Sequence, residues 1–86
     1  MTKKNFSDRV LDVVRKIPKG KTLSYGEVAR IAGSPGAGRA VGTIMKNNYD
    51  PKVPCHRVIY ASGKLGNYNR GKARKRKLLR KEGVAV

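Results

Sequence analysis

Residues 24–48 decide the fold, and they read SYGEVARIAGSPGAGRAVGTIMKNN. Ser24 and Glu27 have the spacing of a capping box, in which a hydroxyl and a carboxylate satisfy each other's backbone donors at the start of a helix. Residues 34–38 are rich in glycine and predict a turn, after which Arg39 opens a second stretch with apolar residues at helical spacing. Two short helices joined by a glycine-rich turn predict a helix-turn-helix.

A further helix is expected before this unit. Ser7 is its expected N-cap, and Asp8 suits the positive end of the helix dipole. Pro18 and Gly20 are expected to end it. Its apolar residues recur at helical spacing and predict one buried face: Val10, Val13, Val14 and Ile17.

A strand and a basic helix are expected after the helix-turn-helix. Residues 58–60 predict the strand, which turns at 61–63 and returns through Lys64-Leu65. The last helix is expected from Lys72 to Lys81, with Gly83 as its C-cap. The 86 residues are expected to form one domain, residues 1–86.

The charge of the chain is strongly unbalanced. It holds 21 Lys and Arg against 5 Asp and Glu, a formal net charge of +16. Residues 64–81 contain nine basic residues and no acid, which favours a surface that faces phosphates. A ribosomal protein, a membrane-associating protein or a protein adapted to high salt stays a competing interpretation.

Several classes of protein are excluded by composition. The single cysteine rules out an intramolecular disulfide, and the apolar runs are too short to cross a bilayer. We therefore expect an intracellular, cytoplasmic protein, associated with the nucleoid in a prokaryote, and no membrane partner. One cysteine, one histidine and scattered acids do not have the spacing of a metal site, so neither a metal nor a cofactor is expected.

The only cysteine and the only histidine are neighbours, in VPCHRVI (53–59). A free thiol has a pKa of about 8.5 and needs a base or a positive field to react at neutral pH. His56 can act on Cys55 only if the backbone bends there or through a water molecule, because adjacent side chains of a strand point to opposite faces. Glu82 is a candidate to orient the histidine, and a surface carboxylate is the equally weighted alternative. Cys55 as an inert core cysteine also stays open.

The motif and its surroundings resemble the O6-alkylguanine-DNA alkyltransferases. Residues 54–58, PCHRV, are similar to the active-site signature of that family. Further segments match the same domain in the same order: 17–21, 24–29, 39–42, 66–68 and 78–83. The resemblance covers roughly residues 6–84. It implies an α+β, mainly helical, winged-helix-like domain with a helix-turn-helix, equivalent to the C-terminal domain of the family, and it predicts that the family's N-terminal domain is absent.

The resemblance also implies an irreversible DNA repair reaction. Cys55 would attack the alkyl carbon on O6 of guanine in duplex DNA after the nucleotide flips out, and it would keep the alkyl group as a thioether. His56 would be a water-mediated base oriented by Glu82, and Asn48 would organise the site. Tyr25 would help to rotate the nucleotide and bond to the guanine edge.

The remaining implied contacts are with DNA and with the flipped base. Arg39 would fill the gap that the base leaves. The implied DNA-binding residues are Arg39, Tyr25, Ala40, Gly42, Met45, Lys46 and Arg57. The implied base pocket is formed by Val58, Tyr68, Asn69 and Lys75. The protein is expected to act as a monomer on double-stranded DNA that contains O6-alkylguanine.

This sequence departs from the family pattern in two places. Asn69 stands where many members of the family have a serine, and the loop between Asn48 and Cys55 is a residue shorter than in some, which leaves the size of the pocket open.

Two alternatives to alkyl transfer remain. Short alkyltransferase-like relatives bind the same lesions and flag them for excision repair, and they have tryptophan or alanine in place of the cysteine. A plain basic winged-helix protein with an unreactive cysteine is the third interpretation.

Overall fold

The computed structural model describes residues 5–66, 68 and 70–86. Within these residues the chain is α+β and mainly helical, as predicted. None of the helices in this described part is long and apolar enough to cross a membrane. The elements, in chain order, are α1 (Phe6–Arg15), β1 (Leu23–Ser24), α2 (Tyr25–Ile31), α3 (Gly38–Lys46), the 3₁₀ turn η1 (Cys55–Arg57), β2 (Val58–Ile59) and α4 (Lys72–Lys81).

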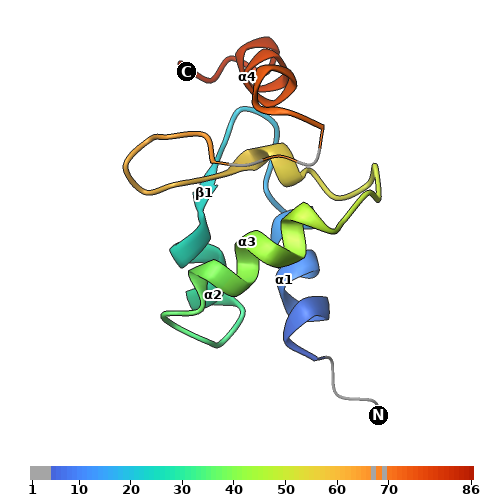
Figure 1. Ribbon diagram of the computed structural model, residues 1–86, viewed down its shortest axis with the longest axis vertical. Coiled ribbons are helices and arrows are strands. Elements are labelled where there is room, and N and C mark those ends of the chain that lie inside the picture. Colours follow the sequence, from blue (N-terminus) through green and yellow to red (C-terminus); the bar gives the residue numbers. More distant parts are fainter. Residues whose placement is uncertain (1–4, 67, 69) are drawn as a thin grey trace.

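The helix-turn-helix is formed by α2 and α3, which pack against each other and against α1 (Figure 1). The predicted capping box is confirmed: the Ser24 hydroxyl accepts a hydrogen bond from the Glu27 N–H, and the Glu27 carboxylate accepts one from the Ser24 N–H, both at 3.0 Å. Helix α2 ends at Ile31, and Gly33 then adopts a φ of +94°, which L side chains rarely allow. Helix α3 begins at Gly38, one residue before the expected position.

The predicted N-cap of α1 is wrong. Asn5 caps the helix instead, because its side-chain oxygen accepts a hydrogen bond from the Asp8 N–H at 2.8 Å. Ser7 lies inside the first turn and is exposed. The helix ends at Arg15, and the chain continues in a tighter turn that still buries Ile17.

Of the strand predicted at 58–60, residues 58 and 59 are present as β2, and its expected partner is wrong. Residues 64 and 65 form no strand; the Tyr60 N–H donates to the Lys64 carbonyl at 2.9 Å and closes a turn. Strand β2 pairs with β1 instead, in parallel, with Leu23 opposite Val58. Such a pairing joins segments far apart in the chain, so no local sequence pattern indicates it.

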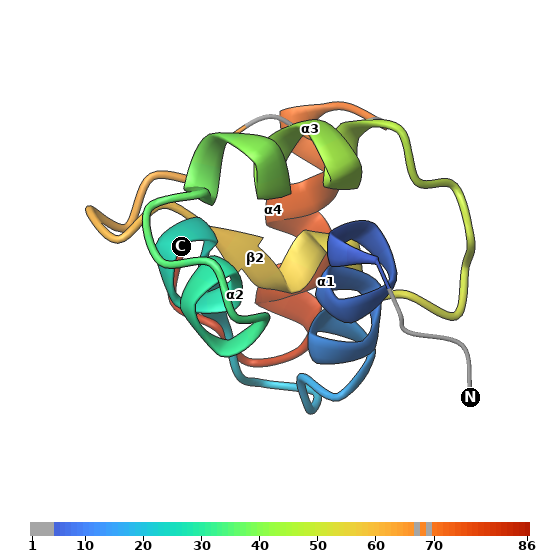
Figure 2. The same ribbon diagram turned by 90° about the horizontal axis from the view of Figure 1, so that it is seen from below.

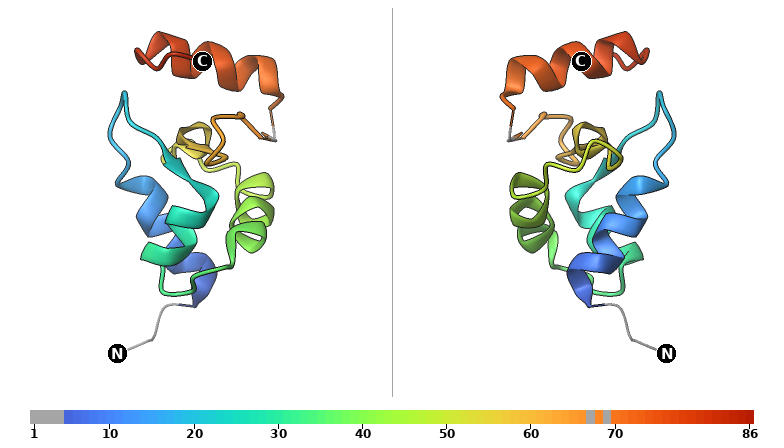
Figure 3. Two further views of the ribbon diagram at one scale, coloured as in Figure 1. Left: turned by 90° about the vertical axis from the view of Figure 1, so that its left-hand side faces the viewer. Right: turned by 90° about the vertical axis from the view of Figure 1, so that its right-hand side faces the viewer.

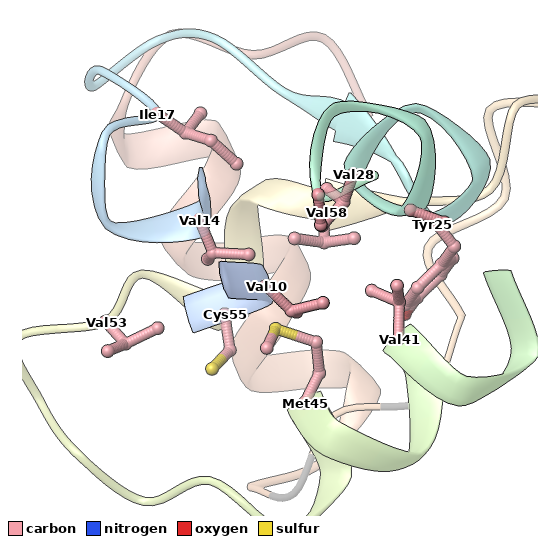
Figure 4. Close-up of a cluster of buried hydrophobic side chains, with 12 residues drawn as sticks. Val10, Val14, Ile17, Tyr25, Val28, Val41, Met45, Val53, Cys55 and Val58 are labelled. Carbon is pink, nitrogen blue, oxygen red and sulfur yellow. The ribbon is translucent and has the colours of Figure 1, made fainter. Parts of the chain in front are cut away.

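The core lies where the helices meet η1 and β2. Figure 2 shows β2 at the centre of the molecule, surrounded by α1, α2 and α3. Helix α4 lies across one end of the molecule and packs against η1. Beneath it, α1 and α2 form one side of the molecule and α3 forms the other (Figure 3). Figure 4 shows the buried side chains, which include Cys55 at 6% exposure. The only nucleophilic thiol of the chain is therefore built into the core.

Candidate active site

Cys55 sits on η1, between the loop after α3 and strand β2. Its N–H donates to the Val53 carbonyl at 2.8 Å, and its Sγ accepts a hydrogen bond from Asn48 Nδ2 at 3.1 Å. The 3₁₀ turn supplies the backbone bend that the sequence required, so Cys55 and His56 are not placed on opposite faces of a strand.

The environment of Cys55 acts on its pKa in two directions. Burial raises the pKa of the thiol, because a charged thiolate is poorly solvated there. The hydrogen bond from Asn48 and the positive charge of Lys75 lower it, and burial outweighs them. The free protein therefore holds a protonated thiol at neutral pH, with groups beside it that favour the thiolate.

His56 is held by a partly buried network of charges. Its Nε2 lies 2.9 Å from Glu82 Oε2, and Arg57 makes two hydrogen bonds to the same carboxylate, at 2.9 and 2.8 Å. The hydrogen bonds from Arg57, and to a smaller extent the one from His56, lower the pKa of Glu82 to about 2. An ionised carboxylate only accepts hydrogen bonds, so His56 Nε2 carries a hydrogen and a neutral ring keeps its lone pair on Nδ1.

Arg57, which the resemblance names as a DNA contact, makes hydrogen bonds within the protein. Its guanidinium is bound to Glu82 and also donates to the Ile17 carbonyl at 2.8 Å. The side chain is 17% exposed. Arg57 therefore joins the end of α4 to the segment after α1, and it orients Glu82 toward His56.

Lys75 is fully buried under the site. Its Nζ donates to the Val58 carbonyl at 2.6 Å and to the Tyr25 hydroxyl at 3.3 Å. Burial lowers the pKa of Lys75 to about 8 and raises that of Tyr25 to about 12. The resemblance implies that Val58 and Lys75 belong to the base pocket, and in the free protein both residues are 0% exposed.

Two hollows open on this part of the surface. One, of about 360 Å³, contains Cys55 and is also lined by Asn48, His56, Tyr68 and Arg74. Arg57 also lines it, so the structure brings five of the expected site residues together around one opening.

The second hollow, of about 650 Å³, runs along α3. It is lined by Tyr25, Arg39, Gly42, Lys46 and Tyr60, among others. Tyr25 and Cys55 thus line different hollows, and both belong to the buried cluster shown in Figure 4.

Three expected site residues remain. Ala40 is exposed on α3. Met45 is 4% exposed and packs in the core, so the free protein does not present it to a ligand on the surface. Asn69 lies outside the described residues.

The sequence reasoning missed Tyr60. This tyrosine is 49% exposed, and its ring centroid lies 5.0 Å from that of Tyr25. The signal was an aromatic residue directly after a buried strand, next to a turn. Gly66, in the matched segment 66–68, lies against both rings: a Cβ there would come within 2.8 Å of the Tyr25 hydroxyl and 3.0 Å of the Tyr60 ring.

Comparison with known proteins identifies the family. Residues 5–84 match the model of the 6-O-methylguanine DNA methyltransferase, DNA binding domain. A methylated-DNA–protein-cysteine methyltransferase of Mycobacterium tuberculosis is 52% identical over 81 residues, which are 91% of this chain and 48% of that protein. The chain spans about half the length of the curated relatives it matches.

Solved structures agree with this assignment. The crystal structure of Mycobacterium tuberculosis OGT in complex with DNA has a TM-score of 0.86 and 50% identity, and the match covers 94% of this chain and 51% of that one. S. pombe Atl1, in complex with damaged DNA containing O6-carboxymethylguanine, has a TM-score of 0.87 and 38% identity, and the match covers 100% of this chain and 82% of that one. The chain belongs to the 6-O-methylguanine DNA methyltransferase family and corresponds to its DNA-binding domain.

Proposed function

We propose that this protein repairs DNA by moving an alkyl group from O6 of guanine to Cys55, once per protein molecule. The observation that carries the proposal is the arrangement around one opening: the Cys55 thiol bonded to Asn48, and the adjacent His56 held by Glu82. A thiol nucleophile is activated by a base beside it, and here a carboxylate orients that base. The family and its named relatives point to the same chemistry.

The reaction balances without a cofactor. The thiol gives its proton, through water, to Nδ1 of His56, and Glu82 stabilises the resulting imidazolium. The thiolate then attacks the alkyl carbon, so that an S–C bond forms as the C–O6 bond breaks. The electron pair of that bond goes to O6 of guanine, and the base takes up a proton. A thioether is not hydrolysed under mild conditions, so each protein acts once.

The proton for the departing guanine is assigned to Tyr25. The Lys75 ammonium group can only donate hydrogen bonds, so the Tyr25 hydroxyl oxygen accepts one from it. The hydroxyl hydrogen of Tyr25 therefore points away from Lys75. The raised pKa, about 12, keeps the phenol protonated at neutral pH. Lys75 also bonds to Val58, which ties the position of Tyr25 to the strand that follows Cys55.

The DNA is assigned to the hollow along α3. Arg39 and Lys46 line it as cations, and Gly42 leaves room for close approach. An alkylated O6 is buried inside a duplex, so the nucleotide has to flip out, at a free-energy cost of roughly a few kcal/mol. Arg39 would occupy the vacated space and offset part of the lost stacking.

Lesion binding without transfer is the second candidate, and one observation favours it. The structure matches Atl1 as well as it matches M. tuberculosis OGT, with TM-scores of 0.87 and 0.86. The candidates differ at Cys55: transfer consumes the thiol, whereas binding alone leaves it unchanged.

The test is the intact mass of the protein after incubation with duplex DNA that contains one O6-methylguanine. Transfer predicts a gain of one methyl group, mapped to the peptide with Cys55, and no gain with the undamaged duplex. Cys55→Ser should abolish the gain and keep selective binding of the damaged duplex. Selective binding by the wild type without any gain in mass would assign the protein to the second candidate, and binding without selectivity would exclude both.

A further inference from the structure

Tyr60 is a rigidly held aromatic side chain on the surface. It directly follows β2, its N–H donates to the Lys64 carbonyl, and its own carbonyl accepts from the Gly63 N–H, both at 2.9 Å. Its ring rests against Tyr25 with an interplanar angle of 53°, and about half of the residue remains exposed. A fixed, half-exposed ring is suited to stack on another flat group.

Two basic hollows meet at Tyr60. The hollow along α3 contains Arg39 and Lys46, and Tyr60 forms part of its wall. Tyr60 also lines a third hollow, of about 350 Å³, which contains Lys64, Lys72 and Arg76. Figures 1 and 3 show why they adjoin: residues 60–66 lie between α3 and α4.

The third hollow is lined by three cations and by Val86, the last residue of the sequence. None of the ion pairs among the described residues involves Lys64, Lys72 or Arg76. Lys72 stands at the first position of α4, where the helix dipole is unfavourable for a cation, and it faces Arg76 at a spacing of four residues, where like charges repel. A row of phosphates would relieve both effects.

We infer that the two hollows form one track for the backbone of the DNA bound on α3, with Tyr60 as a stacking platform at their junction. The inference rests on the proposed function in taking DNA as the ligand of the α3 hollow. The backbone leaves that hollow past Tyr60 and contacts Lys64, Lys72 and Arg76. The track is thus a second set of DNA contacts, outside the helix-turn-helix.

A DNA backbone fits the track better than an acidic peptide. The track is continuous with the hollow along α3, in a chain whose family model is a DNA-binding domain. A tyrosine between cations is also the combination that single strands use, with bases stacked on the ring and phosphates on the charges.

The charges are tested by the salt dependence of binding to an undamaged DNA duplex. A duplex of about 20 base pairs is long enough, because the 39 Å long axis of the protein spans roughly 12 base pairs. The slope of log K against log salt is negative, and each lost phosphate contact reduces its magnitude by about 0.9. Lys64→Gln/Lys72→Gln/Arg76→Gln should lower it by up to about 2.7. The matched control, Lys16→Gln/Lys19→Gln/Lys21→Gln, removes the same charge from exposed residues that line neither hollow, and its slope should stay within about one contact of the wild type.

The ring is tested with Tyr60→Leu and Tyr60→Phe at one moderate salt concentration, on a duplex whose end carries a few unpaired nucleotides, because only an unpaired base can stack on the ring. Loss of one stacked base weakens binding by about tenfold, so Tyr60→Leu should bind about tenfold more weakly and Tyr60→Phe like the wild type. Equal slopes for the triple variant, its control and the wild type would overturn the track and leave the third hollow to an acidic protein. Equal binding by Tyr60→Leu would overturn the stacking platform. A wild type that does not bind DNA at all would overturn the proposed function itself.

Discussion

At the scale of single residues, the reactivity of Cys55 depends on a balance that its neighbours control. Burial protects the thiol and raises its pKa, while Asn48 and Lys75 oppose that rise. Asn48 does so through a hydrogen bond to Sγ, and Lys75 through its charge. The site thus keeps the nucleophile protonated until a base removes the proton.

Asn48→Ala should slow alkyl transfer and displace its pH profile to higher pH. Without the hydrogen bond, the thiolate loses a stabilising donor and the pKa of Cys55 rises further. A hydrogen bond to a charged group contributes about 1.5–3 kcal/mol, so the rate at pH 7 should fall about ten- to a hundredfold. Single-turnover rates between pH 6 and 10 measure this. A slower reaction with an unchanged pH profile would show that Asn48 acts only on the position of the loop.

Glu82→Gln should lower the free energy of unfolding at neutral pH. The unfolded carboxyl binds a proton near its usual pKa of 4.5, and the folded one only near 2. The stabilisation is therefore fully present above pH 4.5, is lost as the pH falls toward 2, and amounts to roughly 3 kcal/mol. Denaturant unfolding at pH 7 and at pH 3 should show the two proteins converging at acid pH. Asp8→Asn, at an exposed carboxyl, is the control and should change stability little, and a constant difference between wild type and Glu82→Gln at both pH values would contradict this account.

At the scale of elements, the start of α2 determines where Tyr25 lies. Ser24 is the last residue of β1 and the N-cap of α2, so the strand that pairs with β2 passes directly into the helix that carries Tyr25. The capping box therefore fixes the helix-turn-helix relative to the strand after Cys55.

Ser24→Ala should destabilise the protein by about 1 kcal/mol, because the Glu27 N–H loses its acceptor. Ser7→Ala is the matched control: it is the same substitution near a helix start, but Ser7 is exposed and Asn5 is the cap. Its effect should stay within about 0.5 kcal/mol. Chemical denaturation of both variants measures the difference. Equal losses would mean that the capping box contributes nothing beyond helix propensity.

The sequence predicted the elements that rest on local chemistry. The capping box, the turn after α2 and the basic helix from Lys72 to Lys81 follow from spacing and residue type alone, and all are present. The N-cap of α1 was misplaced by two residues because Asn5 and Ser7 are both good caps, and only the geometry selects between them.

Features that depend on tertiary contacts could not be predicted. The pairing of β2 with β1, rather than with Lys64-Leu65, joins residues 35 apart in register. In the sequence, nothing distinguishes Lys75 from the other cations of the basic helix, although it shares a helical face with Leu79 and both are buried. For the site, the adjacent Cys55 and His56 were visible in sequence, whereas the bonds of Glu82 and Asn48 depend on how α4 and the loop after α3 pack.

At the scale of the whole molecule, the dominant feature is a net charge of +16 on a domain with a radius of gyration of 12.2 Å. Such a charge attracts DNA and also repels itself, which destabilises the folded state. The repulsion acts over about 30 Å at 0.01 M salt and over about 8 Å at 0.15 M. At low salt every cation therefore acts on every other one, and at physiological salt only near neighbours do.

Adding salt should stabilise the free protein while it weakens DNA binding. Between about 0.01 and 0.15 M sodium chloride, screening of the repulsion should raise the stability by about 1 kcal/mol, or about 4–8 °C in Tm for a domain of this size. Over the same range DNA affinity falls because each phosphate contact releases counterions. Thermal unfolding and DNA titration in the same buffers measure the two opposite trends. The Lys16→Gln/Lys19→Gln/Lys21→Gln protein carries three fewer charges and should show a smaller rise in Tm. A Tm that falls with salt would mean that ion pairs such as that of Arg57 with Glu82 outweigh the repulsion, and that the excess charge does not destabilise the fold.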